Sequence, residues 1–85
     1  MINKLEIFKK RLLYRASYRG TKEMDILLSN FVKQNIEKLT ESQLYELEDF
    51  LNFEDKDIYN YYQNNITSKK FENNSISAML KKYNV

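Results

Sequence analysis

The sequence predicts an all-α fold, a compact bundle of about five short helices that forms one domain over residues 1–85. The chain contains no proline, and its β-branched residues do not alternate with polar ones as they would in strands. Apolar residues recur instead at intervals of three and four, which is the spacing of one helix face. Short connections between the predicted helices favour antiparallel neighbours.

The first two helices are predicted on either side of the only glycine. The first runs from about Asn3 to Tyr18, with Asn3 as N-cap and Glu6 placed to complete a capping box. We expect Gly20 to adopt a left-handed conformation just after this helix ends. The second helix begins after Thr21, a good N-cap residue. The apolar faces of the two helices comprise Leu5, Phe8, Leu12 and Ala16, followed by Met24, Leu27, Leu28, Phe31, Val32 and Ile36.

Two further start signals mark the third and fourth helices. Thr40 and Gln43 have the spacing of a capping box ahead of the third helix. Asp55 is expected to be the N-cap of the fourth helix, which we predict to end at residues 64–65.

The last part of the chain carries weaker signals. Residues 66–73 are mostly polar, and we predict a loop there that is anchored by Phe71. A final helix is predicted to start near residues 73–74, because apolar residues return at helical spacing beyond that point.

The composition argues against an active site. The chain has no cysteine and no histidine, so disulfides, thiolate metal ligands and the commonest general base are missing. A catalytic triad and a zinc site are therefore not expected, and no cluster of carboxylates suggests another metal site. We predict that the protein is not an enzyme.

Charge is unevenly distributed along the chain, although the formal net charge is only +2. Such a dipolar chain favours an oriented protein partner over the phosphate backbone of a nucleic acid. Two solvated helix faces of opposite sign would give the same pattern. The basic start holds Lys4, Lys9, Lys10, Arg11, Arg15, Arg19 and Lys22, and the acidic middle holds Glu41, Glu46, Glu48, Asp49, Glu54, Asp55 and Asp57.

No apolar run is long enough to span a membrane, and the first residues lack the apolar core of a signal peptide. We therefore expect no membrane partner, and a location in the bacterial cytoplasm or in a matrix-like compartment. We also expect a monomer when the protein is free.

The turn around the single glycine admits two interpretations. In the structural one, Gly20 ends a helix, Arg19 lies in its last turn and Glu23 lies in the first turn of the next helix. In the functional one, a guanidinium, an approachable backbone and a carboxylate are presented together to another molecule. A salt bridge between Arg19 and Glu23 would turn this region inward.

Two motifs carry a resemblance to a known family. The first comprises residues 11–15 and 19–25, with Arg-Gly-x-x-Glu at its centre, and the second comprises residues 50–61. In sequence and spacing they resemble the SdhE family, the FAD assembly factors of succinate dehydrogenase. Two positions depart from the family pattern, since Lys56 stands in place of a proline and Tyr61 in place of a tryptophan.

The resemblance covers about residues 10–64 and implies both a fold and a function. It implies a five-helix bundle that binds the flavoprotein subunit of succinate dehydrogenase, with that of fumarate reductase as a further candidate. It also implies promotion of covalent attachment of FAD to a histidine of that subunit. No cofactor would be stably bound by the chain itself.

The same resemblance assigns residues to the contact with the flavoprotein. Arg19 and Glu23 would make polar contacts near the flavin, and Gly20 would allow close backbone approach. An alternative of another class is a regulatory or antitoxin-like helical module that binds a different protein. Nucleic-acid binding is not expected, because the acidic middle of the chain interrupts any continuous phosphate track. The second-tier contacts are Arg11, Arg15 and Asp25.

Overall fold

The protein consists of helices within residues 3–83, the part of the chain that the computed structural model describes. The elements are α1 (Lys4–Ser17), α2 (Lys22–Asn35), a short 3₁₀ helix η1 (Ile36–Lys38), α3 (Glu41–Leu51), α4 (Asp55–Asn64), α5 (Lys69–Glu72) and α6 (Ser75–Lys82). No strand occurs in that range, so the predicted all-α class is confirmed. No helix there is long and apolar enough to cross a membrane.

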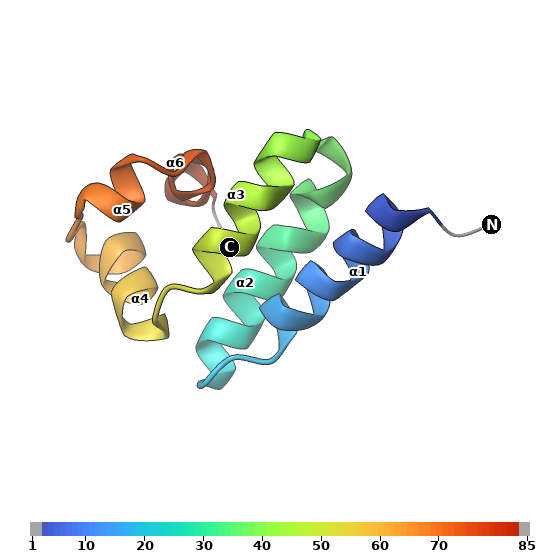
Figure 1. Ribbon diagram of the computed structural model, residues 1–85. Coiled ribbons are helices and arrows are strands. Elements are labelled where there is room, and N and C mark those ends of the chain that lie inside the picture. The colour runs from blue at the N-terminus through green and yellow to red at the C-terminus, as the bar shows by residue number, and fades with distance from the viewer. Residues whose placement is uncertain (1–2, 84–85) are drawn as a thin grey trace.

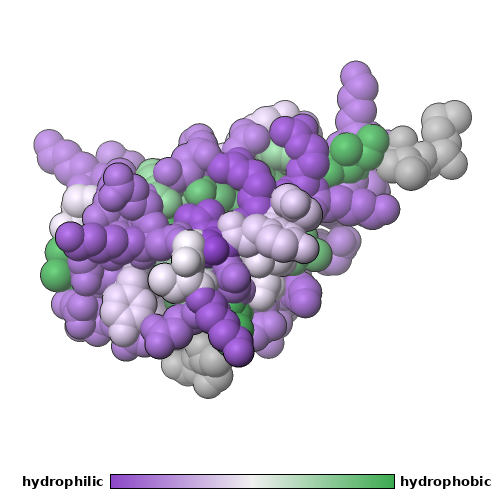
Figure 2. Space-filling model, turned by 90° about the horizontal axis from the view of Figure 1, so that it is seen from below, coloured by the Kyte–Doolittle hydropathy of each residue, from purple (hydrophilic) through white to green (hydrophobic). Residues whose placement is uncertain are grey.

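The three longest helices run alongside one another, and the shorter ones gather beyond α3 (Figure 1). α1 packs against both α2 and α3, and α6 packs against α3. α1 and α3 point in the same direction, because Phe8 meets Tyr45 near their starts and Arg15 meets Asn52 near their ends. The face of the molecule seen in Figure 2 is mostly hydrophilic, with only small hydrophobic areas.

One apolar core joins all the helices. The predicted stripe of α1 is confirmed at Leu12 and Ala16, and Phe8 packs at the edge of the core. Leu5 is 36% exposed, so its predicted place in the buried stripe is wrong. The reason is that Leu5 lines an open hollow between α1 and α3, where the two helices do not pack closely enough to cover it. The core residues of the other helices are Met24, Leu27, Leu28, Phe31, Val32, Ile36, Leu44, Leu47, Phe50, Leu51, Ile58, Tyr61, Phe71, Ile76 and Leu80.

The predicted caps of the first three α-helices are confirmed. The Asn3 side chain accepts a hydrogen bond from the backbone N–H of Glu6 at 2.8 Å. Thr21 accepts one from the backbone of the third residue after it. Thr40 and Gln43 form the full capping box ahead of α3. The capping box predicted for α1 is incomplete, because the Glu6 carboxylate pairs with Lys9 instead.

The predicted loop over residues 66–73 is wrong in its second half, where α5 forms. Both Phe71 and Glu72 donate backbone hydrogen bonds of 3.1 Å to the carbonyl of Ser68, which closes one helical turn. Phe71 is buried as predicted, and its burial holds the turn against the core. The predicted end of α4 is confirmed, since Asn65 is a left-handed C-cap with a φ of 57°.

Candidate partner-binding site

The turn between α1 and α2 lies against the turn between α3 and α4, and Arg19 joins the two. Its Nε donates to Asp55 Oδ1 at 2.7 Å. Its Nη1 and Nη2 donate to the backbone carbonyls of Leu51 and Phe53 at 2.8 and 3.1 Å. The Arg19 side chain is only 10% exposed, so its guanidinium is directed into the protein.

The position of this ion pair suits both helix ends that it touches. The last turn of α3 contains no basic residue, and Arg19 brings a cation to the carbonyl groups that the end of the helix leaves unpaired. Asp55 is the first residue of α4, where a carboxylate is favoured by the helix dipole. A single ion pair therefore stabilises the end of one helix and the start of the next.

Asp55 was predicted to be the N-cap of α4, and this prediction is wrong. Glu54 occupies the N-cap position, with no side-chain capping bond. The Asp55 carboxylate is instead engaged with the other turn, through Arg19 on one oxygen and the backbone N–H of Gly20 on the other. Lys56 lies in the first turn, and the helix start forms without the proline of the family pattern.

Gly20 does not adopt the predicted left-handed conformation, since no glycine in residues 3–83 has a positive φ. Its role is steric. The Gly20 N–H donates to Asp55 Oδ2 at 2.7 Å, and a Cβ at this position would lie 3.0 Å from the same oxygen. Glycine is therefore favoured here because the carboxylate comes so close to its backbone.

The two acids of the first motif have different surroundings. The Asp25 carboxylate, in the first turn of α2, accepts a hydrogen bond from the backbone N–H of Arg19. Glu23 is exposed, and its carboxylate takes part in no ion pair among residues 3–83. The predicted possibility of an Arg19–Glu23 salt bridge is thus replaced by an Arg19–Asp55 pair, with Glu23 directed outward.

Glu23 borders hollows that lie between α2 and α4. One hollow of about 350 Å³ is lined by Thr21, Glu23, Asp55 and Tyr59, among others. A neighbouring one of about 450 Å³ also includes Glu23, together with the exposed side chain of Ile26. An exposed carboxylate, an exposed aliphatic side chain and an aromatic side chain thus lie beside the turn. Aromatic side chains are enriched at protein interfaces, and a charged group such as Glu23 suits the polar rim of such an interface.

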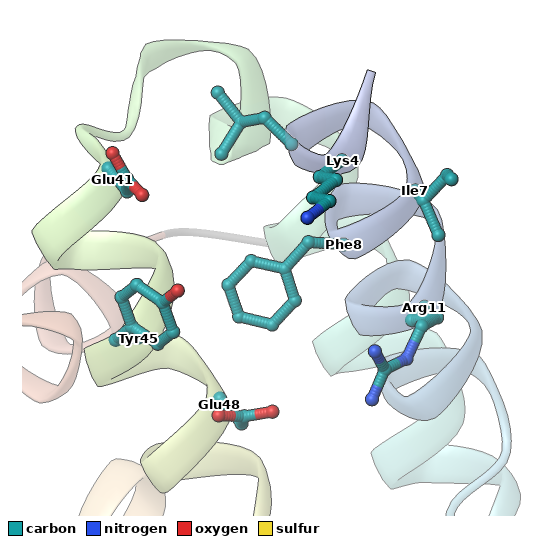
Figure 3. Close-up of a pocket in the computed structure, with 8 residues that line it drawn as sticks. Lys4, Ile7, Phe8, Arg11, Glu41, Tyr45 and Glu48 are labelled. Carbon is teal, nitrogen blue, oxygen red and sulfur yellow. The ribbon is translucent and has the colours of Figure 1, made fainter. Parts of the chain in front are cut away.

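Arg11 and Arg15 lie along α1, on the side that faces α3. The Arg15 guanidinium donates to the side-chain oxygen of Asn52 at the end of α3. Arg11 is exposed and lines a separate hollow of about 510 Å³ between α1 and α3. In that hollow the Phe8 ring faces Tyr45, and Arg11 of α1 and Glu48 of α3 line it from the two helices (Figure 3).

The structure brings together Arg19, Gly20 and Asp25 at one junction, with Glu23 beside it, whereas Arg11 lies farther along α1. Sequence reasoning missed Asp55 as the partner of this turn. The second motif contains that residue, but nothing local shows that it bonds to a turn thirty-five residues away. In the described part of the chain, no group of three or more carboxylates is arranged to hold a metal ion.

A comparison with known protein families identifies the family of this chain. Residues 10–84 match the family described as the flavinator of succinate dehydrogenase. The chain belongs to this family. The match to the succinate dehydrogenase flavinator family includes both motifs and continues beyond residue 64, where the resemblance found in the sequence ended.

Curated proteins with similar sequences carry names of the same kind. A Dictyostelium discoideum protein named succinate dehydrogenase assembly factor 2, mitochondrial, is 45% identical over 60 residues, which are 71% of this chain and 43% of that protein. A Caenorhabditis briggsae protein of the same name is 34% identical over 82 residues, or 93% of this chain and 67% of that protein. The FAD assembly factor SdhE of Acetobacter pasteurianus is 38% identical over 50 residues, or 59% of this chain and 46% of that protein. The chain thus spans about half the length of most of these relatives.

Proposed function

We propose that this protein is an assembly factor that binds the flavoprotein subunit of succinate dehydrogenase and promotes covalent attachment of FAD to it. The observation that carries the proposal is the match of residues 10–84 to the flavinator family. Relatives named as assembly factors in a bacterium and in eukaryotes support the same role. We propose the flavoprotein of fumarate reductase as a second partner of the same class.

The chemistry available to the chain fits a helper of another protein's reaction. It has no histidine or cysteine to act as base or nucleophile. Its single glycine leaves no glycine-rich loop for the pyrophosphate of a dinucleotide, so we propose that FAD stays with the flavoprotein. The protein would accelerate attachment by holding the acceptor side chain and the flavin in a reactive geometry.

We propose that the surface around the turn contacts the flavoprotein. Glu23 would make a polar contact beside the exposed backbone of Gly20. Arg19 and Asp25 would act by holding this turn in shape, because their charged groups are used inside the protein. Arg11 and Arg15 would extend the contact along α1. The exposed rings of Tyr14 and Tyr18, whose centroids lie 4.4 Å apart, belong to the same stretch of the chain.

The free protein would be a monomer in the bacterial cytoplasm or in a matrix-like compartment. Gel filtration with light scattering of the free chain tests the first statement, and fractionation of cells that express the natural gene tests the second. A stable dimer or a membrane-bound fraction would contradict them.

A deletion of the gene tests the proposed function. We expect covalent flavin on the flavoprotein to fall, seen as a loss of fluorescence at the flavoprotein band in a denaturing gel, and to return when the wild-type chain is supplied. Unchanged fluorescence would contradict the proposal. Capture of a different protein as the main partner would favour a regulatory binding module instead.

A single substitution tests whether Glu23 contributes to flavoprotein binding without a role in the fold. Glu23→Ala removes an exposed carboxylate without touching the core, so helical circular dichroism should persist while flavoprotein binding falls about tenfold or more. Glu37→Ala is the matched control, since Glu37 is an exposed acid in η1, just beyond the opposite end of α2, and an ion pair with so exposed a carboxylate contributes little. Equal binding by the two variants would remove Glu23 from the site.

A further inference from the structure

The Asp55 carboxylate bonds to two consecutive residues of the opposite turn, one with each oxygen. Oδ1 accepts from the Arg19 guanidinium at 2.7 Å, and Oδ2 accepts from the backbone N–H of Gly20 at 2.7 Å. Its side chain is 23% exposed, so these charge-assisted bonds are partly shielded from water. The second motif therefore holds the backbone of the first.

Asp55 cannot easily move away from Gly20. Its Oδ1 is held by Arg19, and the same guanidinium is anchored to the carbonyls of Leu51 and Phe53 at the end of α3. A Cβ on residue 20 would meet Oδ2 at 3.0 Å, closer than ordinary van der Waals contact. The φ of Gly20 is not positive, so backbone strain does not explain why glycine is present.

We propose that Asp55 is a positioning residue for the flavoprotein contact, and that it is the reason why residue 20 must be glycine. This inference rests on the proposed function. Asp55 and Glu23 line the same hollow between α2 and α4, and the Gly20 N–H that donates to Asp55 lies just before the start of α2, the helix that carries Glu23. A turn held in its binding conformation loses less conformational entropy on association.

A double-mutant cycle between residues 20 and 55 tests the inference, with affinity for the purified flavoprotein subunit as the readout. Gly20→Ala should weaken binding at least fivefold in the wild-type background. In the Asp55→Ala background the same substitution should weaken binding less than twofold, because the oxygen that meets the new Cβ has been removed. Equal factors in both backgrounds would mean that the glycine serves the partner's approach, and the inference would be overturned.

A conservative variant distinguishes a specific loss of binding from general unfolding. Asp55→Asn keeps the size of the side chain, but its amide must direct N–H groups at either Arg19 or the Gly20 N–H, where only acceptors fit. We expect at least fivefold weaker binding from Asp55→Asn and less than twofold from Asp57→Asn. Asp57 is the matched control, since it lies in the same first turn and pairs with the exposed Lys70. Equal affinities for the two variants would overturn the inference.

Amide hydrogen exchange supplies a readout that does not need the partner. The Gly20 amide should exchange at least tenfold faster in Asp55→Asn than in the wild type, while the amides of the α3 core remain protected. Unchanged exchange at Gly20 would overturn the inference even if binding fell. If the wild-type chain failed to bind the flavoprotein, the proposed function would be overturned, and with it the role of Asp55 in binding. If the wild-type chain bound normally and the Asp55 variants bound equally well, only the inference about Asp55 would be overturned.

Discussion

The helices before and after the α3–α4 turn are held in place by different interactions. α1 and α2 have 14 residues each, carry their own caps and pack through mainly aliphatic side chains. α5 has 4 residues and α6 has 8, which is too short for a stable helix in water. These short helices depend on contacts with residues far away in the sequence.

Those contacts are aromatic and polar. Phe71 of α5 stacks on Tyr61 with ring centroids 4.5 Å apart, and meets Phe53 at 5.1 Å and Phe50 at 6.2 Å. The Asn74 side chain donates to the backbone carbonyl of Glu46 in α3 at 2.9 Å. Local signals therefore suffice for the long helices and also mark the start of α6, whereas distant anchors decide α5 and hold α6 against α3.

Among the substitutions that test this difference, Phe71→Ala should lower the stability of the protein most. Phe71 is only 3% exposed and lies at the centre of the aromatic cluster, so we expect a loss of about 3 to 4 kcal/mol in the free energy of unfolding. Urea denaturation followed by circular dichroism measures it. Ile66→Ala, at an exposed position just before α5, should change stability by less than about 0.5 kcal/mol. A loss below about 1 kcal/mol for Phe71→Ala would show that α5 is not anchored by this ring.

Arg19→Ala should have the next largest effect, because it removes the ion pair that joins the two turns. Asp55 would lose its counter-charge and the end of α3 would lose two donors, so we expect about 2 kcal/mol of destabilisation. Arg19→Lys should lie between wild type and Arg19→Ala, since an ammonium group lacks the donor fork. Chemical denaturation of both variants beside Arg11→Ala, the exposed control, measures the series. Equal stability of Arg19→Ala and Arg11→Ala would contradict a structural role for Arg19.

Asn74→Ala tests the polar anchor of α6. This residue caps α6 through the backbone N–H of Ile76 and also bonds to α3, so its loss should cost about 1 to 2 kcal/mol. Asn73→Ala is the matched control, because Asn73 is the exposed neighbour. Thermal unfolding of the two variants measures the difference, and equal midpoints would indicate that α6 is held by its apolar face alone.

The smallest expected effect is a pH dependence of stability that arises from the contact between Ser75 at the start of α6 and Glu46 of α3. Hydrogen bonds from the Ser75 side chain and backbone hold the pKa of the Glu46 carboxyl below its ordinary value of 4.5. Because the folded-state pKa is the lower one, this contribution is complete above about pH 4.5 and is lost as the pH falls through the folded value. Unfolding midpoints of wild type and Glu46→Gln should therefore converge as the solution is acidified below that pH. Parallel curves for the two proteins would contradict the linkage.

Much of the fold follows from short-range patterns in the sequence. The caps at Asn3, Thr21 and Thr40 were predictable because the capping bond joins residues three apart. The apolar spacing identified most of the core for the same reason, since side chains three or four residues apart share one helix face. The two motifs likewise identified the family before any contact between them was known.

The tertiary structure decided the environment of the turn. Gly20 has no left-handed conformation, and Asp55 is not a cap, because each is bonded to the other across two turns that are distant in sequence. Arg19, which the family resemblance placed in contact with the flavoprotein, is directed to the carbonyls at the end of α3. By itself the sequence determined the longer helices and the two family motifs, because these depend on local spacing, whereas the exposure of Glu23 and the helix α5 emerged only in the structure. Only packing could bring Asp55 to Gly20, because no local propensity encodes a hydrogen bond between separate turns.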